Sequence, residues 1–264
     1  MSKNPLNQIF NSSCEDMKEL DEGSVNLVVT SPPYYNLRDY SEWKSYADHL
    51  IFIKNVLDEC YRVLMPGGWI CWNIQECIPF PPAETKKERE CMPLLAHTIS
   101  LMSDIGFLYE KDIIWYKGKG TATQKLFGSY PYPGLILTSG LTEHIITARK
   151  PRGKFKRKID PEIKEKSILT KQEWGDWAVD IWDVPPVNAK NKNHPAPYPV
   201  EIPRRCIRLN SLWGDLVLDP FMGGGTTAIA CSETGRNFVG YEIHKKYIDL
   251  SLNRIRFNNM SVFE

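Results

Sequence analysis

The 264-residue sequence contains no uninterrupted apolar stretch of about 18 residues, the length that a membrane-spanning helix requires. The segment from Met1 to Ser13 is polar and has no basic start followed by an apolar core, so we expect no secretory signal peptide. None of the seven cysteines forms a Cys-x-x-Cys pair, and no cluster of Cys, His or acidic residues has the spacing of metal ligands. We therefore expect a cytoplasmic protein with reduced thiols, no membrane segment and no bound metal.

The chain also has almost no net charge, since 33 basic and 32 acidic residues leave a formal charge of +1. This charge is unevenly distributed, because the segment from Lys111 to Lys171 holds 14 Lys and Arg against 5 Asp and Glu. Its densest part, residues 149–158, is typical of a solvated loop, but clustered cations also suit contacts with the phosphates of a nucleic acid. The candidates for these contacts are Arg149, Lys150, Arg152, Lys154, Lys156, Arg157 and Lys158.

The first hundred residues alternate between strand-like and helix-like patterns. Val25 to Thr30 is an apolar, β-branched run typical of a strand buried on both faces, and Ser31-Pro32-Pro33 ends it because proline cannot continue a central ladder. Apolar residues at helical spacing predict a helix from Tyr46 to Leu64, and a strand follows at residues 69–74. A similar alternation returns after residue 198. These patterns predict an α/β fold, a doubly wound and mostly parallel sheet with helices on both faces.

The stretch from Gly118 to Asn193 has a different composition. It is rich in Gly, Pro, Lys and aromatic residues and has weak periodicity, although a strand is plausible at Glu143 to Arg149. We interpret this stretch as an insertion or a small subdomain rather than as a layer of the sheet. We therefore divide the chain into three parts, residues 1–117, 118–193 and 194–264.

A glycine turn follows the predicted strand at Leu216 to Asp219. Gly223-Gly224-Gly225 lets the backbone approach a ligand, and the free N–H groups of the helix that opens at Thr226 favour a negative group. About 20 residues further on, Glu242 ends the next strand, where a carboxylate can accept hydrogen bonds from a ribose diol. The turn therefore predicts an adenosine-type cofactor, and its spacing also fits a dinucleotide.

A second motif, Thr30-Ser31-Pro32-Pro33-Tyr34, lies at the carboxyl end of the buried strand, where open α/β sheets bind ligands. The two prolines hold the backbone rigid, so the Ser31 hydroxyl and the Pro32 carbonyl are fixed as hydrogen-bond acceptors. Tyr34 adds an aromatic face. Acceptors beside a stacking ring suit the exocyclic amino group of a flat base.

Four segments occur along the chain in one order: Thr30–Tyr34 (TSPPY), His194–Pro199 (HPAPYP), Asp219–Thr227 (DPFMGGGTT) and Gly240–Ile243 (GYEI). They resemble motifs of the S-adenosylmethionine-dependent DNA amino-methyltransferases of the cytosine-N4/adenine-N6 family. TSPPY is similar to the catalytic (S/D/N)PP(Y/F/W) motif, and DPFMGGGTT is similar to the cofactor motif DPFxGxGT. The catalytic motif comes first and the cofactor motif last, which resembles the order of the family's β group.

The resemblance implies a class I methyltransferase-like fold with permuted motif order. Residues 1–117 would form its catalytic half, 118–193 its target-recognition region and 194–264 its cofactor-binding half. It implies S-adenosyl-L-methionine as the cofactor and double-stranded DNA as the substrate. The catalytic residues that it implies are Ser31, Pro32, Pro33 and Tyr34. The cofactor-binding residues are Asp219, Pro220, Phe221, Gly223, Gly225, Thr226, Thr227, Glu242, Ile243, Pro195 and Ser13.

One position departs from the family pattern. Relatives usually carry Asn-Gly-Asp followed by Cys or Ser after the first strand, and that Asp contacts the adenine of the cofactor. In this chain Asn11-Ser12-Ser13-Cys14 places Ser13 there, so the residue that makes this contact is left open.

The family mechanism assigns a role to each residue of the catalytic motif. The target base would be flipped out of the duplex and stacked on Tyr34. The Ser31 side chain and the Pro32 carbonyl would accept hydrogen bonds from its amino group, and transfer would be direct and in line. Methylation of a cytosine ring carbon needs a Pro-Cys pair in relatives, and no cysteine here follows a proline.

The identity of the methylated base depends on finer features. Serine at position 31, followed by Leu37 to Tyr40, resembles the cytosine-N4 members, and adenine-N6 is the alternative. More distant alternatives are a nicotinamide-dependent oxidoreductase, an inactive DNA-binding relative, and a methyltransferase that acts on RNA or on a protein amide. A cognate restriction endonuclease is a candidate partner, and the protein is expected to be a monomer or a homodimer.

Overall fold

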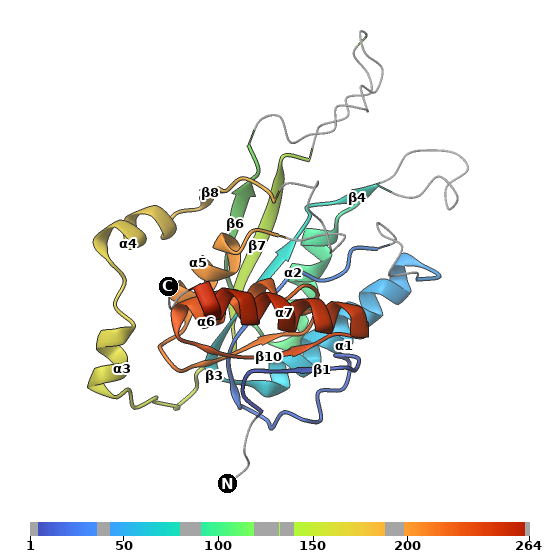
Figure 1. Cartoon of the computed structure of the whole chain (residues 1–264). Coiled ribbons are helices and arrows are strands. Elements are labelled where there is room, and N and C mark those ends of the chain that lie inside the picture. The colour runs from blue at the N-terminus through green and yellow to red at the C-terminus, as the bar shows by residue number, and fades with distance from the viewer. Residues whose placement is uncertain are drawn as a thin grey trace.

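The computed structural model describes residues 5–35, 43–79, 91–118, 132, 140–187 and 198–261. Within these residues, eight strands form one sheet in the order β1-β10-β9-β2-β3-β7-β6-β8 (Figure 1). These strands are β1 (Gln8–Phe10), β2 (Val25–Thr30), β3 (Leu64–Ile74), β6 (Leu108–Tyr116), β7 (Thr142–Arg149), β8 (Ile181–Asp183), β9 (Leu216–Asp219) and β10 (Asn237–Tyr241). The short strands β4 (Ile78–Pro79) and β5 (Cys91–Met92) pair separately.

The five strands from β1 to β3 in this order run parallel to one another. β7 pairs antiparallel with both β3 and β6, and β8 runs parallel to β6. Among the described strands of this sheet, β7 alone therefore runs in the opposite direction, which confirms the mostly parallel sheet. Because the carboxyl ends of parallel strands share one edge, the ends of β2, β3, β9 and β10 lie together there.

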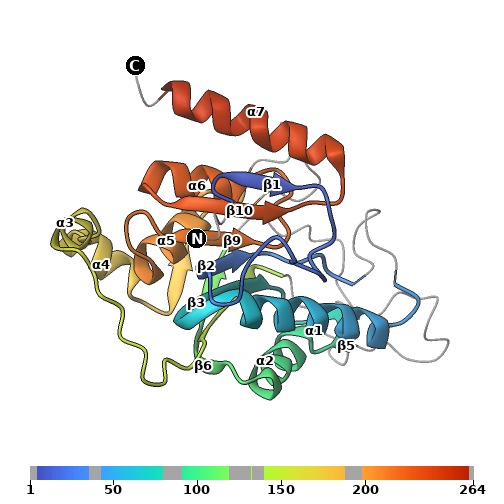
Figure 2. The ribbon, with the colours of Figure 1, turned by 90° about the horizontal axis from the view of Figure 1, so that it is seen from below.

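Seven helices are described, and the longer ones cover both faces of the sheet (Figure 2). Side chains alternate along β2, so Val28 packs in one cluster with α1 and α2, whereas Leu27 and Val29 pack in the other with α5 and α6. This two-sided burial explains the continuous apolar run of the strand. The helices are α1 (Tyr46–Val63), α2 (Leu94–Ile105), α3 (Pro161–Lys166), α4 (Lys171–Trp177), α5 (Glu201–Asn210), α6 (Thr226–Thr234) and α7 (Lys245–Ser261).

Part of the region 118–193 belongs to the sheet, so the interpretation of this stretch as an insertion outside it was wrong on that point. β7 lies between β3 and β6, and β8 forms the sheet edge beyond β6. The strand expected at Glu143 to Arg149 corresponds to β7. Its pairing with β3 and β6 is not revealed by local periodicity, because these partners are remote in sequence. Arg208 of α5 contacts Glu173 of α4 and Ile168, which lies between α3 and α4, and both short helices lie to the side of the sheet (Figure 1). The division of the chain into three functional parts stays a prediction.

Across the described ranges, the structure contains no helix that is both long enough and apolar enough to cross a membrane.

Candidate active site

The two motifs meet where β2 and β9 end side by side in the sheet. Val28 of β2 pairs with Leu218 of β9, so the next residues of the two strands are also neighbours. Thr30 Oγ1 donates a hydrogen bond to Asp219 Oδ1 at 2.5 Å. This contact joins the residue before Ser31 to the first residue of the glycine motif, although 189 positions separate them in the sequence.

Asp219 is a buried acceptor that holds this junction together. Besides Thr30, it accepts hydrogen bonds from Thr227 Oγ1 at 2.6 Å and from the backbone N–H of Phe221 at 3.0 Å. Thr227 is in turn bonded to the Tyr198 hydroxyl at 2.7 Å. Burial raises the pKa of Asp219 from 3.8 to about 6, because desolvation of the carboxylate outweighs these hydrogen bonds.

The glycine turn is fixed by contacts from α7. Ser251 Oγ donates to the carbonyl of Gly223 at 2.6 Å, and Arg254 donates to the carbonyl of Gly224. Gly225 has a φ of +79°, and a Cβ atom there would lie 2.8 Å from Ser251 Cβ. The sequence therefore needs glycine at this position for both its backbone conformation and its close packing.

Glu242 lies directly after β10, opposite the glycine turn. Its carboxylate accepts hydrogen bonds from the backbone N–H groups of Gly223, at 3.1 Å, and His244, at 2.7 Å. Partial burial raises the pKa of Glu242. The amide of Asn11 donates to the carbonyls of Glu242 and Ile243, both at 3.0 Å, and thereby ties β1 to this end of the site.

The remaining residues predicted to bind the cofactor lie around this edge or outside the described part. Ile243 is 61% exposed, whereas Thr226 and Thr227 are buried at the start of α6. Ser13 is exposed, and its hydroxyl accepts a hydrogen bond from the N–H of Glu15 at 3.3 Å. Pro195 lies outside the described residues.

The backbone of the catalytic motif is anchored by a histidine that the sequence did not single out. His49 of α1 is fully buried, and its Nε2 lies 3.2 Å from the carbonyl of Pro33. This contact requires the tautomer that carries its proton on Nε2, since the carbonyl can only accept. Tyr35, Trp43 and Tyr46 surround the imidazole ring, and burial lowers the pKa of His49.

Ser31 and Tyr34 contact side chains from two other strands, β3 and β7. Asn73 Nδ2 donates to Ser31 Oγ at 3.2 Å and to Glu143 Oε2 at 2.6 Å. The Tyr34 hydroxyl donates to the same Glu143 oxygen at 3.1 Å, and Lys117 Nζ donates to Glu143 Oε1 at 2.5 Å. Asn73, Glu143 and Lys117 were missed, although a polar residue among apolar strand residues was a readable signal for Asn73.

The arrangement places a motif suited to holding a flat amino-bearing base beside a motif suited to holding a nucleotide-type cofactor. Residues 25–253 match the family N6_N4_Mtase, described as DNA methylase. The chain belongs to this DNA methylase family. The match confirms the resemblance drawn from the four motifs, and it covers all three parts of the chain.

Individual relatives agree with this assignment. The methylase is 33% identical to the type II methyltransferase M.MthZI of Methanothermobacter thermautotrophicus, over 94% of this chain and 76% of that protein. It is similar to the structure of TTHA0409 from Thermus thermophilus complexed with S-adenosyl-L-methionine, with a TM-score of 0.77, 30% identity and 95% coverage of both chains. The PvuII DNA methyltransferase (cytosine-N4-specific) shares the fold, with a TM-score of 0.70 at 17% identity over 95% of this chain and 86% of that one.

The basic run lies at the opposite edge of the sheet from the catalytic motif. β7 carries Arg149 at its end, and Arg149 pairs with Trp69, whereas His144 near its start pairs with Ile74 at the carboxyl end of β3. That these cations bind DNA stays a prediction, and their position does not bring them together with Ser31 and Tyr34.

Three of the seven cations of this run have partners within the protein. Arg149 is paired with Glu110, and Arg157 with Asp215. Lys150 Nζ donates to backbone carbonyls at the end of α1 and the start of β3, and desolvation lowers the pKa of Lys150. Arg152, Lys154, Lys156 and Lys158 are exposed.

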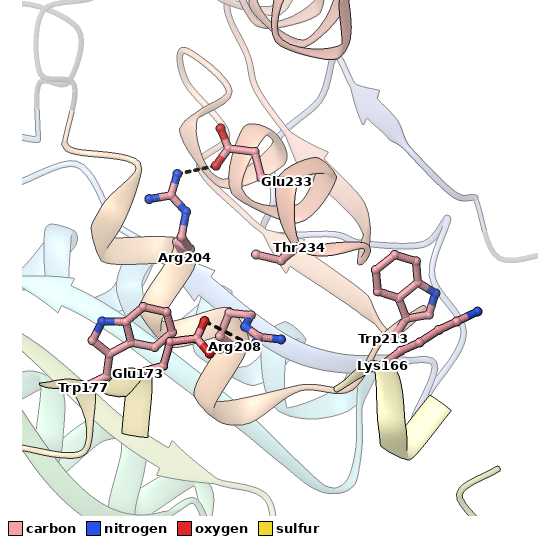
Figure 3. A pocket seen from close by; sticks show the side chains of 8 residues that line it. All are labelled: Lys166, Glu173, Trp177, Arg204, Arg208, Trp213, Glu233 and Thr234. Atoms are coloured by element: carbon pink, nitrogen blue, oxygen red, sulfur yellow. Dashed lines mark hydrogen bonds and ion pairs between the residues drawn. The ribbon is translucent and has the colours of Figure 1, made fainter. Parts of the chain in front are cut away.

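A cavity of about 290 Å³ lies away from both motifs, between α3 and α4 on one side and α5 and α6 on the other (Figure 3). Its charged side chains pair with one another, Arg204 with Glu233 and Arg208 with Glu173. No residue of the catalytic or glycine motif lines it. The described residues that line it are Lys166, Glu173, Trp177, Arg204, Arg208, Trp213, Glu233 and Thr234.

Proposed function

We propose that this methylase transfers a methyl group from S-adenosylmethionine to the N4 nitrogen of cytosine in duplex DNA. The observation that carries the proposal is the hydrogen bond between Thr30 and Asp219, which holds the catalytic and glycine motifs against each other. Because the two motifs share one buried junction, a base at Ser31 and a cofactor at the glycine turn would lie side by side.

The residues of the cofactor half suit S-adenosylmethionine. Bound there, this cofactor supplies an electrophilic methyl group on a sulfonium centre. Glu242, held by two backbone N–H groups, offers a carboxylate to a ribose diol, and the N-terminus of α6, where Gly225 is the N-cap, would suit a negative group of the cofactor. Asp219 keeps the turn in register with β2 through its bonds to Thr30 and Thr227.

The residues of the catalytic half suit an exocyclic amino group. Ser31 Oγ and the Pro32 carbonyl accept hydrogen bonds from this group, which draws its lone pair out of conjugation with the ring. Tyr34 provides a face for stacking of the flipped base. His49 holds the carbonyl of Pro33 and thereby helps to orient the motif. For a direct transfer, orientation and electrostatics would supply most of the catalysis.

Cytosine is proposed as the target because the first residue of the motif is Ser31, a neutral acceptor, and because Leu37 to Tyr40 resembles the cytosine-N4 members. The stretch 37–40 lies outside the described residues. Adenine-N6 is the alternative target within the same family. The type II relative M.MthZI supports a role as the modification enzyme of a restriction–modification system, with a cognate endonuclease as partner.

The decisive experiment is to incubate the purified protein with tritiated-methyl S-adenosylmethionine and unmethylated genomic DNA, followed by digestion to nucleosides and mass identification of the labelled one. Label in N4-methylcytosine is expected. Label in N6-methyladenine would overturn the choice of base, and label only in RNA or protein, tested in parallel, would overturn DNA as the substrate. Gel filtration of the same preparation separates a monomer from a homodimer.

A further inference from the structure

Four polar side chains form a row across four neighbouring strands at the carboxyl edge of the sheet. Ser31 follows β2, Asn73 lies on β3, Glu143 on β7, and Lys117 follows β6. Thr30 pairs with Trp72, so Ser31 and Asn73 are the next residues of that ladder. The sheet therefore links Ser31 to residues 42, 112 and 86 positions away in the sequence.

The hydrogen bonds of this row converge on the carboxylate of Glu143. Lysine, amide and phenol groups all point at Glu143, so one carboxylate accepts three hydrogen bonds. Two of these, from Asn73 and from Tyr34, reach the same oxygen, Oε2. Because the Asn73 amide also donates to Ser31 Oγ, the serine hydroxyl keeps one lone pair for the amino group of a target base.

The row contains a largely buried ion pair that stability alone does not explain. The side chains of Lys117 and Glu143 are only 16% and 11% exposed. Removing two charges from water is costly, and well-packed apolar residues of similar volume stabilise a protein at least as well as such a pair. The pair therefore calls for a reason other than stability at this place, directly behind the catalytic motif.

We propose that Glu143, Asn73 and Lys117 are positioning residues of the methylase. Glu143 Oε2 fixes both ends of the catalytic motif, Tyr34 directly and Ser31 through Asn73, while Lys117 holds the carboxylate through its other oxygen. The stacking ring and the hydroxyl acceptor are thereby set at one mutual distance. This inference rests on the proposed function, since it assigns these residues to the same site.

Two double variants distinguish the role of Glu143 as a hydrogen-bond acceptor from the role of its negative charge. Glu143→Leu with Lys117→Met removes the ion pair without leaving a buried charge, and it also removes the acceptor of Asn73 and Tyr34. Glu143→Gln with Lys117→Met is equally uncharged, but an amide oxygen in the place of Oε2 can still accept both bonds. Thermal unfolding of both variants checks that they fold.

Single-turnover methylation measures the consequence. We expect the Leu/Met variant to methylate DNA about 100-fold more slowly than the unchanged protein, because a misplaced motif loses orientation. The Gln/Met variant should recover at least about tenfold of this loss. Binding of S-adenosylmethionine, measured by calorimetry, should stay within about threefold in both, because the row does not contact the glycine turn. A Leu/Met variant as fast as the unchanged protein, or two equally slow variants, would overturn the proposal.

A matched control exists on the opposite face of the same strand pair. Asp112 on β6 and His144 on β7 form a half-buried pair at 2.8 Å, and the variant Asp112→Asn should leave the methylation rate within about threefold.

Crystal structures give a readout that needs no activity: Ser31 and Tyr34 should be displaced in the Leu/Met variant and should keep their positions in the Gln/Met variant. An unchanged protein that methylates no DNA contradicts the proposed function, whereas unmoved Ser31 and Tyr34 contradict the positioning role.

Discussion

The two halves of the active site are built in different ways. In the cofactor half, the carboxylates of Asp219 and Glu242 are held by backbone N–H groups only two residues away, those of Phe221 and His244. In the catalytic half, Ser31 and Tyr34 are held by side chains from β3 and β7, 42 and 109 positions away. The cofactor half therefore combines such local contacts with the long-range bond from Thr30 to Asp219, whereas the side-chain contacts of Ser31 and Tyr34 all come from other strands of the assembled sheet.

The largest loss of folding stability is expected from a substitution in the glycine turn of the cofactor half. Gly225→Ala would force a φ of +79° on alanine and place its Cβ 2.8 Å from that of Ser251. Gly153, with a φ of +55° and no heavy atom of another segment within 4 Å of its ideal Cβ, is the matched control. Gly225→Ala should cost about 1–3 kcal/mol more stability than Gly153→Ala, because only the former adds overpacking to backbone strain.

Chemical denaturation of the two glycine variants measures this difference, and calorimetry with S-adenosylmethionine should show weaker binding for Gly225→Ala. Equal stabilities would mean that α7 moves aside, and the turn would then not depend on its packing against Ser251.

An effect on folding stability of similar size is expected at Asp219, where the two halves meet. The pKa of Asp219 is raised from 3.8 to about 6, so the stability associated with its neutral form is present at low pH and lost as the pH rises through about 6. A shift of this size corresponds to about 3 kcal/mol at neutral pH and above. Asp219→Asn does not titrate, so it should be more stable than the unchanged protein at pH 8, and this advantage should shrink below pH 6.

Thermal unfolding of Asp219→Asn across this pH range tests the assignment. An advantage that does not change with pH would show that the carboxylate is better solvated than its burial indicates. Because the amide can still bond Thr30 and Thr227, loss of cofactor binding in the same variant would show that the negative charge itself contributes there.

The contrast between the halves also explains which parts of the site could be predicted. The prediction of a strand, a helix and a strand in the cofactor half agrees closely with the structure, which has them at residues 216–219, 226–234 and 237–241. Both signals, the spacing of apolar residues and the glycine turn, can be recognised within a short stretch of sequence. The same holds for β2 and α1, where Ser45 caps the helix by accepting a hydrogen bond from the N–H of Asp48. In these segments the pattern that indicates each element lies within the element itself, so the local sequence is sufficient to predict it.

The contacts of the catalytic half depend on strand register instead. Asn73, Lys117 and Glu143 meet only because β7 enters the sheet antiparallel between β3 and β6, and no local pattern in residues 118–193 indicates that order. Two short helices in this region did have readable signals. Asp160 precedes Pro161 at the start of α3, and Thr170 with Glu173 forms a capping box at the start of α4.

A smaller effect should separate the two tasks of Tyr34. Tyr34→Ala removes the stacking face and should cost about 1–3 kcal/mol of transition-state stabilisation. Tyr34→Phe keeps the ring and loses the hydroxyl that donates to Glu143, so it should cost about 0.5–1.5 kcal/mol. Single-turnover methylation measures both, and equal losses would indicate that the hydroxyl contact, and not stacking, is the main contribution of this residue.

The smallest effect is expected at the far edge of the sheet, where the comparison with the catalytic edge is sharpest. The sequence predicts that Lys154, Lys156 and Lys158 contact phosphates, and each lost contact would reduce the salt slope of DNA binding by about 0.9. These residues follow β7 at the edge opposite Ser31, so a short duplex with its target base in the site should not reach them. Replacing all three by Ala should therefore leave the slope for a short duplex unchanged. A flatter slope would show that the run contacts even a short duplex, and the DNA would then have to extend from the carboxyl ends of the strands to the opposite end of the sheet.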